Sequence, residues 1–124
     1  SVGIASTEEI NRLGIRPATF LAYARALERI PEADHLLIDA WTLPETNVPQ
    51  CGIIGGDAKV ASIAAASILA KEERDRMMTA LHTVYPMYGF DRHKGYGTKV
   101  HLDAIRRYGP CPEHRTSWSV FETL

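Results

Sequence analysis

Residues 36–39 have the sequence Leu-Leu-Ile-Asp, and this short apolar run decides the fold that we expect. It follows a segment with helical periodicity, and such a run is typical of a strand that is buried on both faces in a parallel sheet. Residues 51–54 form a second short strand candidate, which Gly55 and Gly56 close. Together the two runs predict an α/β fold in which helices pack on a short parallel sheet.

Four helices are expected outside the strands, over residues 7–14, 17–30, 58–84 and 99–108. Ser6 or Thr7 can cap the first helix, and Asp57 is the expected cap of the third. The second helix opens at Pro17 and has apolar residues at three- and four-residue spacing, which predicts one buried stripe. Residues 86–98, between the third and fourth helices, are expected to form a loop.

Length and composition restrict the class of protein. The chain has 124 residues, which fits one domain, and its 45% apolar and 23% charged residues are typical of a globular protein. No apolar run approaches the roughly 18 residues that a membrane span needs. A net charge of −1 excludes a strongly basic protein that coats nucleic acid.

Charge is uneven along the chain. Residues 1–57 hold four arginines against eight acids, whereas residues 86–124 hold six basic residues against four acids. An anionic partner is therefore expected at the C-terminal third, and a solvated surface of mixed sign is the alternative.

The cysteines and the first residues bear on where the chain works. Cys51 and Cys111 stand far apart, without a Cys-x-x-Cys pair, so a reducing cytoplasm is the expected location. No basic and apolar leader opens the chain, which argues against a secretory signal. The first residue is Ser1 and the first methionine is Met77, so we expect a processed chain or a piece of a longer one.

Asp39 is the first candidate for chemistry, because it closes the strand at 36–39. In open α/β sheets the ligand crevice lies beyond the carboxyl ends of the strands, where an acid is well placed for catalysis or metal binding. An aspartate that only forms the turn after the strand is the alternative interpretation.

The long helix carries the second set of candidates. Ser67, Lys71 and Asp75 are spaced i, i+4, i+8, so they share one helical face. The opposite stripe is expected to face the core and includes Ile63, Met77, Leu81 and Val84. The alternative for the first face is close helix–sheet packing at the small residues 64–67, with an ion pair between Lys71 and Asp75 at the surface.

A glycine- and aromatic-rich stretch, residues 88–99, is the third candidate. Its glycines let the main chain approach a ligand, and Lys94 can meet phosphate groups. Tyr96 lies between two glycines and can place its ring against a sugar or a base. In the alternative, Tyr88 and Phe90 anchor this stretch in the core, and both roles are compatible.

A zinc site is a further alternative. The four side chains that could bind zinc in the C-terminal third are those of His93, His101, Cys111 and His114. Their spacing is irregular and no Cys-x-x-Cys pair frames them, which argues against such a site.

A series of short motifs runs through the chain. In order, they are Gly-Asp-Ala-Lys at 56–59, Ala-Ala-Ser-Ile-Leu-Ala-Lys at 65–71, Arg-Asp at 74–75, Tyr-Gly-Phe at 88–90, His-Lys-Gly-Tyr-Gly-Thr at 93–98, Gly-Pro at 109–110, His-Arg at 114–115 and Ser117. Their order and spacing closely resemble ribonuclease HII, the type 2 ribonucleases H. The resemblance covers essentially the whole chain and implies a ribonuclease H-like fold. It also implies an endonuclease that hydrolyses RNA in RNA–DNA hybrids and at ribonucleotides embedded in DNA.

The resemblance also implies roles for particular residues. In this family four acids hold two divalent cations, Mg²⁺ or Mn²⁺, and Asp39 and Asp75 match two of the four. They are therefore the expected catalytic and metal-binding residues, converging on a cation pocket next to Tyr96. Tyr96 matches the tyrosine that senses the ribose-to-deoxyribose junction. Contact with substrate phosphates is the weaker expectation for Ser67, Lys71 and Lys94.

The sequence departs from the family pattern in two places. It contains no Asp-Glu-x-Gly-Arg-Gly run, which supplies the other two acids, and Thr116 and Trp118 replace the usual Arg and Phe. We therefore expect residues 1–124 to form one partial domain without its N-terminal strands, with the sheet and core helices in 1–85 and the substrate loop and last helix in 86–124.

Three consequences are expected from that departure. The isolated chain is expected to be inactive or nearly so, because two carboxylates are poor candidates for clamping two cations. The exposed strand edge is expected to associate with another copy or with a missing N-terminal segment supplied in trans. The alternatives are a non-catalytic remnant that binds nucleic acid and a zinc-stabilised interaction domain.

Overall fold

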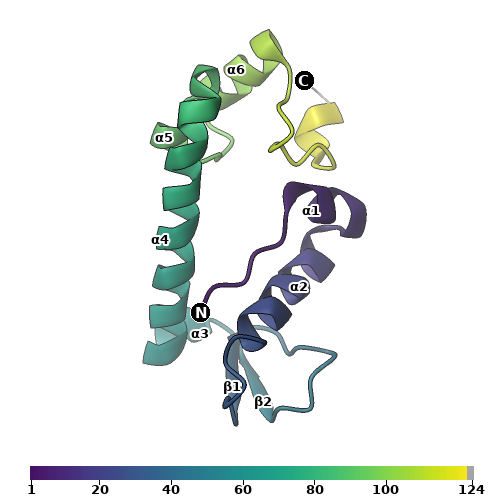
Figure 1. Cartoon of the computed structure of the whole chain (residues 1–124), viewed down its shortest axis with the longest axis vertical. Coiled ribbons are helices and arrows are strands. Elements are labelled where there is room, and N and C mark those ends of the chain that lie inside the picture. The colour runs from purple at the N-terminus through teal and green to yellow at the C-terminus, as the bar shows by residue number, and fades with distance from the viewer. Residues whose placement is uncertain (123–124) are drawn as a thin grey trace. The chain divides into compact units, whose positions relative to one another are not determined.

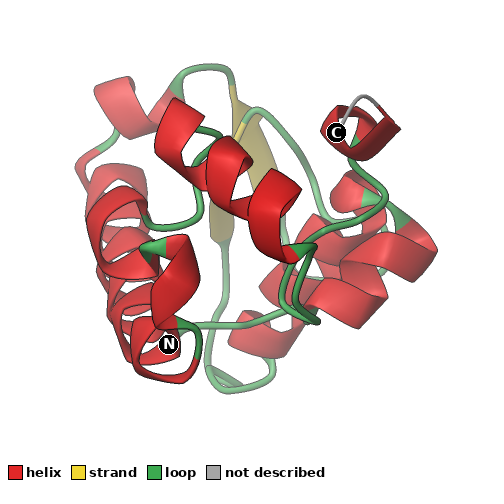
Figure 2. Ribbon diagram, turned by 90° about the horizontal axis from the view of Figure 1, so that it is seen from above, coloured by secondary structure: helices red, strands yellow, loops and turns green. Residues whose placement is uncertain are grey.

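The sheet consists of two short parallel strands (Figure 2). The structure is a computed structural model and describes residues 1–122. Strand β1 (Leu36–Asp39) pairs with β2 (Gln50–Ile53), with Leu36 opposite Gln50 and Asp39 opposite Ile53. The structure thus confirms the α/β class and the short parallel sheet that the two apolar runs predict.

The expectation that β1 is buried on both faces is wrong. Ile38 is buried, whereas Leu37 is 44% exposed and Cys51 and Gly52 of β2 are exposed. Successive side chains of a strand point to opposite faces of the sheet. The face that bears Leu37 has no covering layer among the described residues, so the run of apolar letters marks a strand with one covered face.

The first two helices begin close to where the sequence predicts. Helix α1 (Thr7–Leu13) has a capping box, in which the Ser6 hydroxyl accepts from the Glu9 N–H and the Glu9 carboxylate accepts from the Ser6 N–H. Helix α2 (Ile15–Leu27) holds Pro17 in its first turn and ends before the predicted residue 30.

The predicted long helix is divided in two. Helix α3 (Gly56–Lys59) is separated from α4 (Ala61–Val84) by Val60, whose φ of −127° and ψ of 117° are those of extended chain. Asp57 lies in the first turn of α3 and the cap is Gly55, so the prediction of Asp57 as cap is wrong. Gly55 has a φ of 66°, which glycine adopts without strain.

Short helices replace most of the expected loop at 86–98. The described elements after α4 are η1 (Pro86–Tyr88), α5 (Phe90–His93), α6 (Lys99–Tyr108) and η2 (Ser119–Glu122). The bounds of α6 confirm the prediction: the Thr98 hydroxyl accepts from the His101 N–H at its start, and Gly109 ends it.

The chain divides into two compact units. Unit 1 consists of Ser1–Ala5 and Ile15–Lys71, and unit 2 consists of Ser6–Gly14 and the chain from Glu72 on. Helix α4, the long helix in Figure 1, contributes residues to both units. The prediction of one partial domain with a division at residue 85 stays a prediction.

Each unit has its own buried apolar residues. In unit 1 these are Ala18, Ile38, Leu43 and Ile63. In unit 2 the core cluster consists of Tyr88, Phe90, Ile105 and Cys111. Tyr88 and Phe90 are 4% and 2% exposed, which confirms that they anchor the core.

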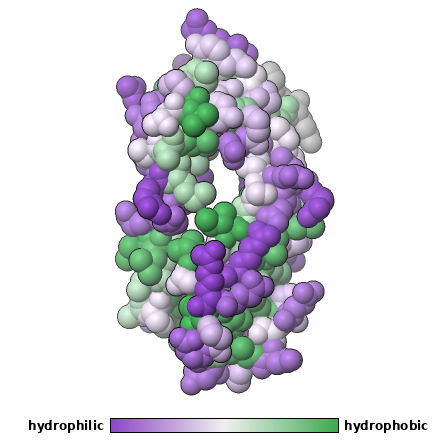
Figure 3. Space-filling view, viewed as in Figure 1, coloured by the Kyte–Doolittle hydropathy of each residue, from purple (hydrophilic) through white to green (hydrophobic). Residues whose placement is uncertain are grey.

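The apolar stripe expected on α4 is only partly buried. Ile63 is buried and Leu81 packs against the core of unit 2, but Met77 is 44% and Val84 63% exposed. A helix of 24 residues is about 36 Å long, which exceeds what a small core covers. Figure 3 accordingly shows apolar surface beside hydrophilic surface on the face that it draws.

Within residues 1–122, none of the helices has both the length and the apolar character needed to cross a membrane.

Candidate functional site

Asp39 lies at the carboxyl end of β1, where its carboxylate is held by the main chain. Its Oδ1 accepts a hydrogen bond of 2.8 Å from the Gly56 N–H at the start of α3. A Cβ at Gly56 would lie 2.7 Å from Ile63 Cδ1 and 3.5 Å from Asp39 Cα, so only glycine lets α3 approach β1 this closely. Asp39 is half-buried, and its carboxylate is thus oriented by contacts within unit 1.

Ser67 and Lys71 lie on the part of α4 that belongs to unit 1, and both are exposed. Ala65 and Ala66 beside them are also exposed, so the close packing expected as an alternative at these small residues is absent from the described chain. Both side chains of the predicted substrate contact are therefore accessible to a ligand.

Asp75 lies one turn further along α4, in unit 2, together with Lys94 and Tyr96. It is half-buried, and its main-chain oxygen accepts from the Thr79 hydroxyl at 2.9 Å. The neighbouring Arg74 joins this part of α4 to the predicted substrate loop. Its Nη1 donates to the Lys94 carbonyl oxygen at 2.6 Å, and its guanidinium lies 5.4 Å from the centre of the Tyr96 ring.

The Tyr96 loop, defined here as residues 93–98, has an unusual backbone. Lys94 and Gly95 both have positive φ, 50° and 79°. A Cβ at Gly95 would lie 3.0 Å from Met78 Cε. Glycine therefore suits this position for two reasons, because it adopts positive φ without strain and because it leaves room for Met78. Lys94 is half-buried and its ammonium donates to the Asp91 carbonyl oxygen, which holds it against its own loop.

The ring of Tyr96 is 59% exposed, although its main chain is fixed. The Tyr96 N–H donates to the His93 carbonyl oxygen at 2.9 Å, and the Tyr96 carbonyl oxygen accepts from the Thr98 N–H at 2.8 Å. A fixed backbone with an exposed ring is an arrangement suited to stacking on a sugar or base.

The zinc alternative is wrong for the described residues, in which no three His, Cys, Asp or Glu side chains form a group able to hold a metal ion. The histidines of the C-terminal third are engaged with the main chain instead. His93 Nε2 lies 2.7 Å from the Tyr88 carbonyl oxygen, and His101 Nδ1 lies 2.9 Å from that of Tyr96. His114 Nδ1 accepts from the Cys111 N–H at 2.9 Å.

Burial determines the charge of two of these histidines. It lowers the pKa of His101 and of His114 below the ordinary value of 6.5, because a charged ring loses its hydration inside the core. Burial also raises the pKa of the Cys111 thiol and of the Tyr88 hydroxyl. Burial therefore favours the neutral forms of His101, His114, Cys111 and Tyr88.

Two residues that contact Tyr96 were not predicted for that role. Arg74 was visible only as the letter before Asp75, and His101 was considered only as a zinc ligand. The signal available for His101 is its place three residues after Thr98, in the first turn of the last helix. No local pattern indicates that Arg74 reaches the loop 20 residues away.

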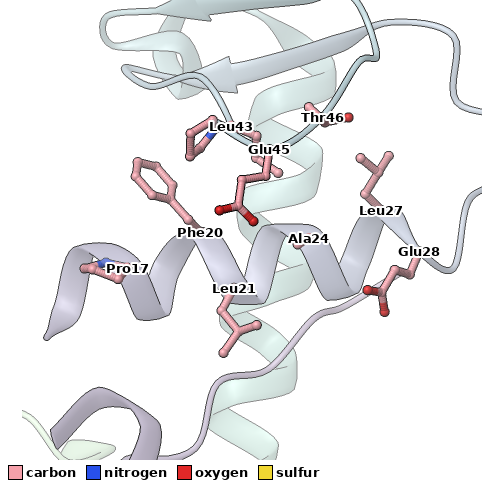
Figure 4. A pocket seen from close by; sticks show the side chains of 10 residues that line it. Pro17, Phe20, Leu21, Ala24, Leu27, Glu28, Leu43, Glu45 and Thr46 are labelled. Atoms are coloured by element: carbon pink, nitrogen blue, oxygen red, sulfur yellow. The ribbon is translucent and has the colours of Figure 1, made fainter. Parts of the chain in front are cut away.

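A pocket of about 460 Å³ lies within unit 1, between α2 and the loop that follows β1 (Figure 4). It is mostly apolar and is lined by Pro17, Phe20, Leu21, Ala24, Leu27, Glu28, Leu43, Pro44, Glu45 and Thr46. None of the predicted site residues is among those that line it, so this pocket is separate from the candidate chemistry.

Comparison with known proteins agrees over almost the whole chain. A sequence model of the family described as Ribonuclease HII matches residues 1–121. The curated relatives named Ribonuclease HII include one from Chlamydia pneumoniae, 56% identical over 99% of this chain and 58% of its own length. One from Caldanaerobacter subterraneus is 47% identical over 94% of this chain and 49% of its own length. One from Desulfitobacterium hafniense is 54% identical over 96% of this chain and 46% of its own length.

The chain spans about half the length of the curated relatives it matches. The match of the family sequence model runs from the first residue to within three residues of the last. This extent confirms the resemblance that the motifs suggest, and the chain belongs to the ribonuclease HII family.

Proposed function

We propose that this chain is part of an endonuclease that cuts RNA in RNA–DNA hybrids and at ribonucleotides embedded in DNA. The observation that carries the proposal is the Tyr96 loop, in which a fixed main chain presents an exposed ring between two glycines. Together with membership of the family, this arrangement supports Tyr96 as the residue that recognises the junction between ribose and deoxyribose.

Asp39 and Asp75 are the metal-binding and catalytic residues in this proposal. Carboxylate oxygens are the hard ligands that Mg²⁺ and Mn²⁺ prefer. The Gly56 N–H bond supports the role of Asp39, because a carboxylate fixed through Oδ1 needs little reordering to bind a cation through its other oxygen. Bound divalent cations would make the attacking water more acidic and neutralise charge on the leaving oxygen.

Two carboxylates are poor candidates for holding two cations. The described residues contain no group of three or more His, Cys, Asp and Glu side chains that could hold a metal. Two-metal hydrolysis therefore needs further acids, and the Asp-Glu-x-Gly-Arg-Gly run that would supply them is not in these 124 residues. The 124-residue polypeptide is accordingly expected to cleave nothing by itself, or almost nothing.

Ser67, Lys71 and Lys94 are proposed to contact substrate phosphates. The exposure of Ser67 and Lys71 supports this role, since both residues lie at the surface. Lys94 supports it less directly, because its ammonium donates to the Asp91 carbonyl oxygen and must leave that bond to meet a phosphate.

Cleavage of a duplex that carries one embedded ribonucleotide tests the proposal. The purified chain with Mg²⁺ or Mn²⁺ should leave the duplex intact, and adding a segment with the Asp-Glu-x-Gly-Arg-Gly strands of a relative should produce cutting. The matched control is the same mixture with Asp39→Asn, which should not cut. Efficient cutting by the chain alone, or cutting that survives Asp39→Asn, would contradict the proposal.

A non-catalytic binding module is the second candidate, and the charge of residues 86–124 favours it, with six basic residues against four acids. It predicts that the added segment restores no cleavage although the chain binds the duplex. The salt dependence of binding measures how many phosphates are contacted.

The bare edges of the sheet support association with another polypeptide. In the described chain β1 and β2 pair only with each other, and Leu37, Trp41 and Ile54 nearby are 44%, 45% and 79% exposed. We propose that a segment carrying the Asp-Glu-x-Gly-Arg-Gly strand of the family, or a second copy of this chain, pairs here. Sedimentation of the chain should show association that Leu37→Lys weakens.

The free thiols of Cys51 and Cys111 support a reducing compartment, the cytoplasm.

A further inference from the structure

A continuous series of contacts joins three parts of unit 2. The Cys111 N–H donates to His114 Nδ1 at 2.9 Å, and His114 Nε2 lies 3.0 Å from His101 Nε2. His101 Nδ1 then lies 2.9 Å from the Tyr96 carbonyl oxygen. The series therefore begins at the turn after α6 and ends on the main chain of the Tyr96 loop.

The partners at the two ends determine where the protons lie. A carbonyl oxygen only accepts, so His101 must donate from Nδ1 to Tyr96. A main-chain N–H only donates, so His114 Nδ1 accepts from Cys111 and its proton is on Nε2. The two conclusions agree at the centre, where the Nε2–H of His114 donates to the bare Nε2 of His101.

Other contacts hold both rings in this orientation. His101 and His114 are 5% and 6% exposed, and the His101 ring stacks on that of His93 with centroids 4.3 Å apart. Phe90 lies against both rings, with centroid distances of 5.5 Å. A longer contact of 3.3 Å between His114 Nδ1 and the Cys111 carbonyl oxygen is the only competing arrangement in the described residues.

We infer that His101 and His114 are positioning residues for Tyr96, acting through a directed hydrogen-bond relay that fixes the Tyr96 main chain. The inference rests on the proposed role of Tyr96 in recognising the ribose junction. The relay orders the loop before substrate arrives, so that less conformational entropy is lost when the exposed ring meets the nucleic acid. It also makes the loop depend on residues 111–114, which lie far from it in the sequence.

Two substitutions at one position separate the two halves of the relay. The amide of Asn reaches as far as Nδ1 of a histidine, so His101→Asn can still donate to the Tyr96 carbonyl oxygen but loses the contact with His114. The amide of Gln reaches as far as Nε2, so His101→Gln keeps the contact with His114 but loses the bond to Tyr96. A role in packing alone predicts equal effects of the two.

Nuclear magnetic resonance of the full chain tests the relay without any substrate. Imidazole nitrogen spectra at neutral pH should show His101 protonated on Nδ1 and His114 on Nε2. Hydrogen exchange of the Tyr96 and Thr98 amides should rise about fivefold in His101→Gln, the effect of one lost hydrogen bond. It should rise less in His101→Asn, which keeps the bond to Tyr96 but loses the support of His114. The opposite tautomers, a charged ring, or equal exchange in the two variants would overturn the inference.

Binding distinguishes failure of the relay from failure of the proposed function. Fluorescence anisotropy compares a duplex with one ribonucleotide and an all-DNA duplex of the same sequence. Tyr96→Ala should abolish the preference for the ribonucleotide, and His101→Gln should reduce it about fivefold. If Tyr96→Ala changes nothing, the role of Tyr96 fails and the relay positions no substrate contact. If only Tyr96→Ala has an effect, the relay alone is refuted.

Discussion

Unit 1 and unit 2 are stabilised in different ways, although each carries one of the two proposed metal-binding acids. Unit 2 has an aromatic and histidine core around Phe90, which is 2% exposed and contacts the rings of Tyr88, His101 and His114. Unit 1 has two strands with one covered face and leaves Leu37 and Ile54 exposed. Unit 2, which presents Tyr96, therefore has an aromatic core. The sheet that bears Asp39 has only two strands and leaves one face exposed in the described residues.

The largest expected effect concerns the core of unit 2. Phe90→Ala should lower the free energy of unfolding by about 3–5 kcal/mol, because it removes a fully buried ring and leaves a cavity. Ile54→Ala in unit 1 is the control, and it should change stability by less than about 0.5 kcal/mol, since this side chain is 79% exposed. Urea unfolding measures both. Similar losses would contradict the contrast between the units.

The next effect concerns the junction of β1 and α3 in unit 1. Gly56→Ala should cost about 1–3 kcal/mol, because the new Cβ would lie 2.7 Å from Ile63 Cδ1 and must move α3 away from Asp39. Gly14→Ala is a useful comparison, since nothing lies within 4 Å there and only the φ of 84° opposes the change. Thermal unfolding should rank Gly56→Ala as the more damaging. The reverse order would mean that α3 is not packed against β1 as described.

A smaller effect should appear on acidification and should originate in unit 2. Burial lowers the pKa of His101 and His114. Below about pH 6.5 these two histidines therefore bind protons in the unfolded chain before they do so in the folded chain. The stabilisation is complete above pH 6.5 and is lost as the pH falls through the lowered pKa values. Cys111 and Tyr88, which face these rings, have raised pKa values and stay neutral throughout, while His93 stacks on His101.

Unfolding measured in urea between pH 5 and pH 8 tests this pH dependence. The double substitution His101→Gln and His114→Gln should flatten the profile, whereas His35→Gln, at an exposed position, should leave it unchanged. A profile that keeps its shape without the two buried histidines would show that other groups cause it.

Local signals predicted much of the fold. Ser6 followed by Glu9 marked the start of α1, and Gly109 marked the end of α6, because caps act through neighbouring main-chain groups. The two apolar runs predicted parallel strands because a short continuous apolar run is itself a local signal. The break at Val60 was missed because the residue types around it suit a helix.

The candidate site was predicted less completely, because its supports are tertiary contacts. The resemblance predicts Asp39, Asp75 and Tyr96 as site residues, and these roles stay predictions. The contacts around them join distant parts of the sequence: the bond from Gly56 to Asp39 spans 17 residues and that from Arg74 to Lys94 spans 20. The contact of His101 with His114 likewise joins residues 13 apart, so the same letters were interpreted as zinc ligands. One sequence without its fold gives no measure of such distances.

Binding of Mn²⁺ followed by electron paramagnetic resonance tests most directly the central proposal, that binding of a divalent cation needs both Asp39 and Asp75. Asp39→Asn and Asp75→Asn should each weaken Mn²⁺ binding by about tenfold or more. The double variant should bind Mn²⁺ no more weakly than the single variant with the lower affinity. Asp57→Asn, at an exposed acid of α3, should leave binding unchanged. Unaltered affinity in either single variant, or losses that simply add in the double variant, would contradict the claim.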